Sequence, residues 1–202
     1  TSTSTVCEGT DVTLVTANTN GSWSENGTGS NTGTTYSTGN IGADENVTVP
    51  YTVATNGQCS GSTADQTFTV NYSPAAATNT TSTSTVCEGT DVTLVTANTN
   101  GSWSHNGSGS ISGTTYSTGN ISADENVTVT YTVAANGQCN GSTAPQTFTV
   151  NADPGTASNT TSAAAICEGT VKTLTGTPSG GSMSLIAGSG SIVGVGFHYT
   201  TG

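Results

Sequence analysis

The sequence predicts an all-β chain built of tandem β-sandwich modules, each with two sheets. Residues 1–80 (repeat 1) and 81–160 (repeat 2) are identical at 66 of 80 aligned positions, and a third, partial copy (repeat 3) begins near Ser158. A long fixed period of this kind is typical of a repeat array. Thr and Val are abundant while strong helix formers are scarce, which favours strands. About six or seven short strands per repeat, with turn signals every eight to twelve residues, indicate a sandwich.

The strands of repeat 1 follow from alternating apolar and polar residues. The segment 11–17 places Val12 and Leu14 on one face, and Asn-Gly turns bound the next segment, "GSWS". The expected strands are 11–17, 21–24, 33–38, 46–57 and 64–72. Pro50 lies inside the longest of them, and because proline cannot donate to a ladder it should mark an edge or a bulge.

The five cysteines recur at fixed places. Cys7 and Cys59 are 52 residues apart, and so are Cys87 and Cys139. This equal spacing predicts one disulfide inside each repeat, which would stabilise it by about 4 kcal/mol in the chain-entropy model. Cys167 repeats the first position; we expect its partner beyond Gly202, with an intermolecular bridge as the alternative. Paired cysteines without a Cys-x-x-Cys motif indicate structural disulfides in an oxidising compartment.

Changes in composition predict the module boundaries. Pro, Ala and Thr replace the apolar alternation at 71–85 and 151–165. We therefore expect modules at 1–73, 74–153 and 154–202, the last incomplete, with short extended linkers that arrange them as beads on a line.

The charge balance excludes two classes of partner. The chain has 12 acids, one base (Lys172) and a net charge of −11. It cannot neutralise phosphates, so we expect no nucleic acid, and it has no basic patch for anionic lipid. No apolar run approaches the ~18 residues that span a bilayer, so we expect no membrane insertion. We expect the sequence to be a soluble segment from within a longer chain, or a processed fragment.

The order of short motifs is similar to a known family. "VCEGTDVTL", "GSWS.NGTGS", "TTYSTGNI.ADENVTV", "NGQC" and "QTFTVN" together resemble the tandem Ig-like repeats of very large secreted surface proteins of Bacteroidota. The resemblance covers both complete repeats and the visible part of repeat 3. It implies an Ig-like fold, export from the cell, and a role in adhesin stalks, gliding-type filaments or spacers of secreted enzymes. Repeat 3 departs from the pattern, because Met183 replaces the tryptophan.

Trp23 and Trp103 have two interpretations. As exposed platforms they would stack on sugars; as core residues they would pack near the disulfide, as in Ig-like sandwiches. Met183 at the matching position of repeat 3 favours the core, because methionine fills a gap but offers no flat ring.

The "ADEN" segments place adjacent carboxylates before the longest strand. Asp44 and Glu45, with Asp124 and Glu125 in repeat 2, are weak candidates for Ca²⁺ ligands, but their spacing matches no established site. A solvated acidic turn is the simpler interpretation, so we expect no cofactor and no metal.

Catalysis is not expected. "GQCSG" and "GQCNG" have the form of a nucleophile motif, but repeat 1 contains no histidine that could serve as its base. The repeats and the resemblance together imply a structural stalk or filament region of a repetitive surface adhesin. The alternative is a polysaccharide-binding or spacer module of a secreted hydrolase. The expected partners are neighbouring repeats and like chains in a filament, with a surface or polysaccharide ligand bound elsewhere in the full protein.

Overall fold

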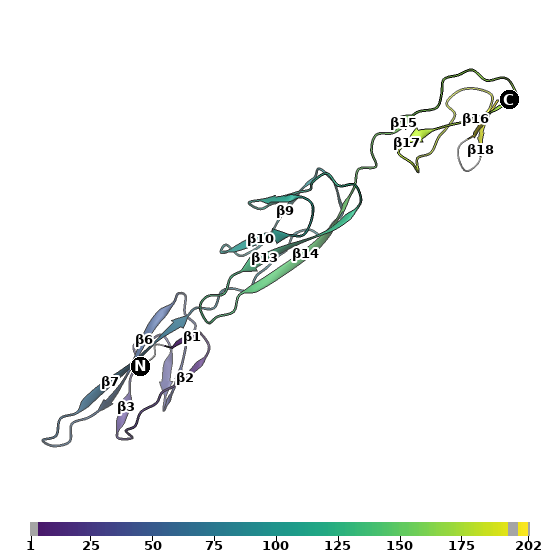
Figure 1. The fold of residues 1–202 in the computed structure, drawn as a ribbon. Coiled ribbons are helices and arrows are strands. Elements are labelled where there is room, and N and C mark those ends of the chain that lie inside the picture. The colour runs from purple at the N-terminus through teal and green to yellow at the C-terminus, as the bar shows by residue number, and fades with distance from the viewer. Residues whose placement is uncertain (1–3, 194–197, 202) are drawn as a thin grey trace. The chain divides into compact units, whose positions relative to one another are not determined.

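The computed structural model describes residues 4–193 and 198–201, and in these residues the chain is all-β, with no helix. The chain divides into two compact units, Thr1–Asn151 and Ala152–Gly202. The first unit contains repeat 1 and residues 81–151 of repeat 2, and the two have the same order of strands (Figure 1).

Repeat 1 has two sheets. The four-stranded sheet has the order β1-β7-β6-β3, and its strands are β1 (Thr5–Cys7), β7 (Ser62–Asn71), β6 (Glu45–Val53) and β3 (Gly21–Trp23). The three-stranded sheet has the order β2-β5-β4, and its strands are β2 (Asp11–Thr13), β5 (Thr35–Ser37) and β4 (Ser30–Thr32). All pairs are antiparallel except β1 with β7, which is parallel and places Cys7 opposite Asn71.

Repeat 2 has the same two sheets. The larger has the order β10-β13-β14-β8, with β10 (Gly101–His105), β13 (Glu125–Val133), β14 (Ser142–Asn151) and β8 (Val86–Cys87). The smaller has the order β11-β12-β9, with β11 (Ser110–Ser112), β12 (Thr115–Ser117) and β9 (Asp91–Thr93). The two repeats of this unit are thus similar β modules.

Each of these repeats has one apolar core to which both sheets contribute. In repeat 1 the buried residues are Leu14, Tyr36, Val47, Val49, Phe68 and Val70. The matching residues form the core of repeat 2. Burial raises the pKa of the Tyr36 phenol, whose oxygen accepts a hydrogen bond from the Gly29 amide at 3.0 Å. The expected alternation along the longest strand is confirmed, since Val47, Val49 and Tyr51 are all buried.

Several expected strands are present but shorter, and two were missed. The segment 11–17 pairs only as far as Thr13. The unpredicted strands are β1, which lies in a Thr/Ser tract, and β4, which is half-exposed and polar. Neither shows the apolar alternation on which sequence assignment depends.

Pro50 shortens the edge strand beside it. In repeat 2, β10 continues to His105, opposite Val129 and Thr130. In repeat 1, β3 ends at Trp23, and Ser24 N still donates to Pro50 O at 3.1 Å. The reciprocal bond is lost because proline has no N–H. The residue therefore marks a local edge of the sheet.

The second unit contains smaller sheets. Their orders are β15-β17 and β16-β19-β18, and the strands are β15 (Ser158–Asn159), β16 (Val171–Thr173), β17 (Gly176–Thr177), β18 (Ser191–Val193) and β19 (His198–Thr200). Within its described residues no strand matches the long β6 and β7. Leu174 is accordingly only partly buried, whereas the matching Leu14 and Leu94 are buried.

The expected disulfides are wrong. Cys7 is bonded to Cys139, while Cys59 and Cys87, like Cys167, are free and exposed. Cys7 lies opposite Asn71 at one end of β7, whereas Cys59 lies in the turn that precedes the other end. Ten residues of β7 separate these ends by about 33 Å. A disulfide joins Cα atoms less than about 7 Å apart, so Cys7 cannot reach Cys59. The same separation along β14 keeps Cys87 from Cys139.

Candidate functional site: the junction between repeats 1 and 2

The Cys7–Cys139 disulfide joins repeat 1 to repeat 2. The two cysteines are 132 residues apart in the sequence, and their Cα atoms lie 4.9 Å apart. Cys139 belongs to the tight turn between β13 and β14, which is closed by two hydrogen bonds between the backbones of Asn136 and Cys139, at 3.0 and 2.9 Å. The tip of the second repeat's long hairpin therefore meets the first strand of repeat 1. A disulfide of this kind forms and persists in an oxidising compartment.

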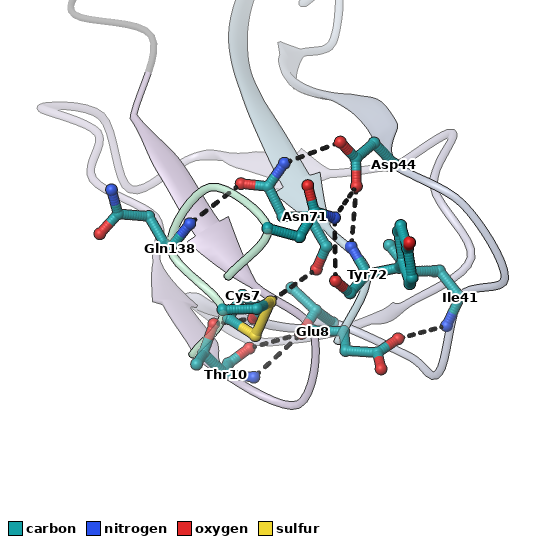
Figure 2. Close-up of a disulfide and its surroundings, with 11 residues drawn as sticks. Cys7, Glu8, Thr10, Ile41, Asp44, Asn71, Tyr72 and Gln138 are labelled. Atoms are coloured by element: carbon teal, nitrogen blue, oxygen red, sulfur yellow. Dashed lines mark hydrogen bonds between the residues drawn. A yellow bond between two sulfur atoms is a disulfide. The ribbon is translucent and has the colours of Figure 1, made fainter. Parts of the chain in front are cut away.

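Asn71 lies at the centre of the contact. Its side-chain oxygen accepts from the Gln138 backbone amide at 3.3 Å, and its amide nitrogen donates to Asp44 at 3.0 Å. Figure 2 shows Asn71 between Asp44 and the turn that carries Gln138. The Cys139 sulfur lies 3.2 Å from Asn71 O, and because a disulfide sulfur carries no proton, this is a close contact and not a hydrogen bond.

Asp44 accepts hydrogen bonds from both repeats. Its Oδ1 accepts from the Tyr72 amide at 3.0 Å and from Nδ2 of Asn136 at 2.7 Å. The Tyr72 amide has the largest effect on the pKa of Asp44, followed by Asn136; together with Asn71 they lower it below its usual value, although partial desolvation opposes them. Asn136 Nδ2 also donates to Tyr72 O at 3.0 Å. The Asp44 carboxylate is therefore held ionised by amide donors at the junction.

Gly137 allows the turn to approach Asn71. Its φ is +54°, and a Cβ added there would overlap the Asn71 side-chain oxygen. Gly57 is the matching residue of repeat 1, with φ +58°, and an added Cβ there meets no atom within 4 Å. Both glycines serve the turn, but only Gly137 also serves the contact.

The segment 77–81 between the repeats is docked on repeat 2. Asn79 is buried, and its Nδ2 donates to Val129 O at 3.0 Å and to Ala144 O at 3.1 Å. Gln146 Nε2 donates to Asn79 O at 3.3 Å. These bonds fix the segment to the backbones of β13 and β14, so it is part of the repeat 2 module.

The same segment also bonds the residues that follow β9. Thr80 N donates to Val95 O at 2.9 Å, and Val95 N donates to the Thr81 hydroxyl at 3.1 Å. The Thr78 and Thr96 hydroxyls lie 3.1 Å apart. The docked segment thus lies across the gap between the two sheets of repeat 2.

Repeat 1 has an open groove at the matching place. The groove has a volume of about 270 Å³, and its lining includes Val15, Thr16, Ala64 and Gln66. Their counterparts in repeat 2, Val95, Thr96, Ala144 and Gln146, are four of the residues that contact the docked segment. Val15 is 76% exposed, whereas Val95 is 44% exposed.

The tryptophans lie at the margin of the core. Trp23 and Trp103 are partly buried against their core clusters and pack on Tyr51 and Tyr131, with ring centroids 4.8 and 4.9 Å apart. They are not fully buried because β3 and β10 are edge strands. Trp23 also lines the groove of repeat 1.

The remaining carboxylate candidates bond within their own repeats. Glu45 accepts from the amide and hydroxyl of Thr28, and Glu125 accepts in the same way from Ser108. Asp124 is the counterpart of Asp44. Among the residues that the structure describes, no group of three or more His, Cys, Asp and Glu lies close enough together to hold a metal. The described residues also contain no helix long and apolar enough to cross a membrane.

A larger hollow, of about 750 Å³, lies in the second unit. It is lined by residues 157–159 and 173–184, among them the partly buried Leu174 and Met183. Leu174 and Met183 match Leu94 and Trp103 of repeat 2, and residues 157–159 match 77–79 of the docked segment. The lining contains no titratable side chain, so it offers no acid or base for chemistry.

Sequence reasoning missed Asn71, Asn79, Asn136 and Gln138. One signal was available: repeats 1 and 2 differ at five of the ten positions from 71 to 80, yet both asparagines of that stretch are retained. Comparison of the two repeats thus singles out Asn71 and Asn79, but it does not indicate which residues they contact.

Comparison with models of known protein families found no match, and comparison with curated proteins found none either.

Proposed function

We propose that this chain is a structural stalk region of a repetitive extracellular surface protein, built of Ig-like two-sheet sandwich modules and without catalysis. The observation that carries this proposal is the Cys7–Cys139 disulfide between repeats. A repeat array gains length by copying a module, but it keeps that length under tension only when the junctions between repeats resist separation. A covalent bond with amide contacts around it meets that need.

The disulfide also changes the route of tension through the first unit. Force that enters near Cys7 passes through the sulfur bond to Cys139, so the intervening residues carry little load. Stretched residues span at most about 3.5 Å each, so the 132-residue separation corresponds to about 460 Å of chain that cannot be pulled out. Such a shortcut suits a spacer whose length must stay constant.

Single-molecule stretching from the two chain termini tests this role. The oxidised protein is expected to reach a full extension about 460 Å shorter than the protein reduced with dithiothreitol. Equal extensions in both states would show that the junction bears no load. The Cys59→Ser variant should behave as the unmodified protein, because Cys59 is free.

Location at the cell surface requires a separate test. Antibodies against residues 1–151 are expected to label intact cells of the producing organism. Labelling only after permeabilisation would place the chain inside the cell and overturn the proposal.

Polysaccharide binding is the second candidate, favoured by Trp23, which is partly exposed in the groove beside Asp65 and Gln66. However, the matching groove of repeat 2 is occupied by the chain itself, which argues that the groove evolved for peptide. A glycan array with the intact chain separates the candidates: specific sugar binding that is lost in Trp23→Ala would favour the second.

A further inference from the structure

The two halves of the junction occur a second time, at other places on the first unit. Advanced by one 80-residue period, Cys59 matches Cys139; set back by one period, Cys87 matches Cys7. The observed separation of 132 is the 52-residue spacing plus one period, so the bonded pair joins the first cysteine of one repeat to the second cysteine of the next. Cys59 and Cys87 are the unbonded members of the same pattern, and both are exposed.

The hairpin tip of repeat 1 has the same backbone geometry as the tip of repeat 2 that carries the disulfide. Asn56 and Cys59 exchange backbone hydrogen bonds of 3.1 and 3.0 Å, close to those of Asn136 and Cys139. Gly57 has φ +58° against +54° for Gly137. The tip is therefore preorganised, which lowers the ordering cost of docking.

The groove of repeat 1 provides an independent observation. In repeat 2 the matching residues Val95, Thr96, Ala144 and Gln146 bond the segment 77–81. In repeat 1 their counterparts line an open volume of about 270 Å³. The tip and the groove of repeat 1 thus match the two places on repeat 2 that contact Asn71 and the segment 77–81.

The contact joins two different surfaces. One repeat contributes its first cysteine, its last strand residue and the segment that follows; the next contributes its tip and its groove. Every copy has one surface of each kind, so a heterologous contact between two copies leaves one surface free on each of them for a further copy.

We propose that the groove and hairpin tip of repeat 1 form an acceptor surface for a further copy of the same repeat, with Cys59 bonded to the first cysteine of that copy. The incoming copy places its counterpart of Asn71 on Gly57 and its counterpart of the segment 77–81 in the groove. The inference rests on the junction geometry, and it stands whether or not the chain serves as a stalk.

The bond-forming step consumes a small-molecule disulfide such as oxidised glutathione. One thiolate attacks it and releases one glutathione thiol; the second cysteine then attacks the mixed disulfide and releases the other. Two protein thiols lose two electrons and two protons in total, and one glutathione disulfide becomes two thiols.

The test uses the full chain with residues 1–80 duplicated in front of Thr1. Residues 1–10 are identical to 81–90, so this lengthened chain recreates the native sequence 71–90 at the new junction. It is folded with oxidised glutathione, and free thiols are counted after denaturation. Cys59→Ala in the original repeat 1 is expected to free one more thiol, because the first cysteine of the added copy loses its partner. The same substitution in the added copy is expected to remove a thiol that was already free.

A matched pair of glycine variants tests the geometry. Gly57→Ala in the original repeat 1 should reduce the yield of the new disulfide several-fold, because the methyl group meets Asn71 of the added copy. Gly57→Ala in the added copy imposes the same backbone strain without a facing residue and should leave the yield unchanged. The proposal is overturned if Cys59→Ala in the original repeat frees no thiol, or if both glycine variants lower the yield equally. The 202-residue chain with Cys59→Ala serves as the folding control.

Discussion

Gly137 and Gly57 have nearly the same backbone conformation, but only Gly137 lies against another repeat. Their φ angles are +54° and +58°. A Cβ added at Gly137 would overlap Asn71, whereas a Cβ added at Gly57 would meet no atom within 4 Å. One structural position therefore has two roles, and the role depends on what lies opposite. This pair allows the junction to be perturbed with an internal control.

Gly137→Ala should destabilise the first unit more than Gly57→Ala. Both substitutions place a side chain at positive φ, at a cost of about 1 kcal/mol. Gly137→Ala also displaces Asn71 and weakens its bond with Gln138, which should add about 1–2 kcal/mol. Urea unfolding of the two variants measures the difference, and equal midpoints would contradict the junction geometry.

Cys7→Ser and Cys139→Ser should have the same effect, since each removes the same bond. The loop closed by this disulfide is long, so its loss should cost roughly 4–5 kcal/mol in the chain-entropy model. Each variant should also gain one free thiol, that of the abandoned partner. Cys59→Ser is the control and should change unfolding by less than about 0.5 kcal/mol, as a surface substitution. If Cys59→Ser instead frees Cys7, the bond lies inside the repeat.

Asn79→Asp should destabilise repeat 2 by about 3 kcal/mol, because a carboxylate would face two carbonyl oxygens that now accept from the amide. The matching substitution one period later, Asn159→Asp in the second unit, changes an exposed side chain and should have little effect. Thermal unfolding followed by circular dichroism measures both variants. An equally small change in the two would show that the segment 77–81 is not held at this site.

The junction should weaken in acid as Asp44 is protonated. The pKa of Asp44 is lower in the folded protein than its usual value of about 3.9, so its contribution is complete above that pH and is lost as the pH falls through the folded value. Carboxyl NMR titration measures this pKa directly. Asn136→Ala removes one donor and should raise it, while Asn56→Ala, the matching change in repeat 1, should not.

Local sequence patterns predicted the strands and core of each repeat better than the contacts between the repeats. Alternation located the long strands and the residues Val47, Val49 and Phe68 that they bury, because burial on one face leaves a period of two in the sequence. The strands β1 and β4 were missed because polar edge strands leave no such pattern.

The disulfide could not be predicted from spacing alone. In a periodic chain, a pairing within a repeat and a pairing with the next repeat give the same regular intervals. What decides between them is the parallel pairing of β1 with β7, which carries Cys7 to the end of the repeat far from Cys59. That pairing joins residues more than sixty positions apart and has no local signal. The contacts of Asn71 depend on it in turn.

The bond between Cys7 and Cys139 has a consequence for the effect of proteolysis on the chain. A protease that cuts one loop between these two residues divides the backbone of the first unit, but the fragments remain attached through sulfur and through the paired strands on either side of the cut. Separation then requires a second event, either reduction of the bond or a cut outside the bridged region. The molecule can therefore accumulate damage without losing the portion that lies beyond it.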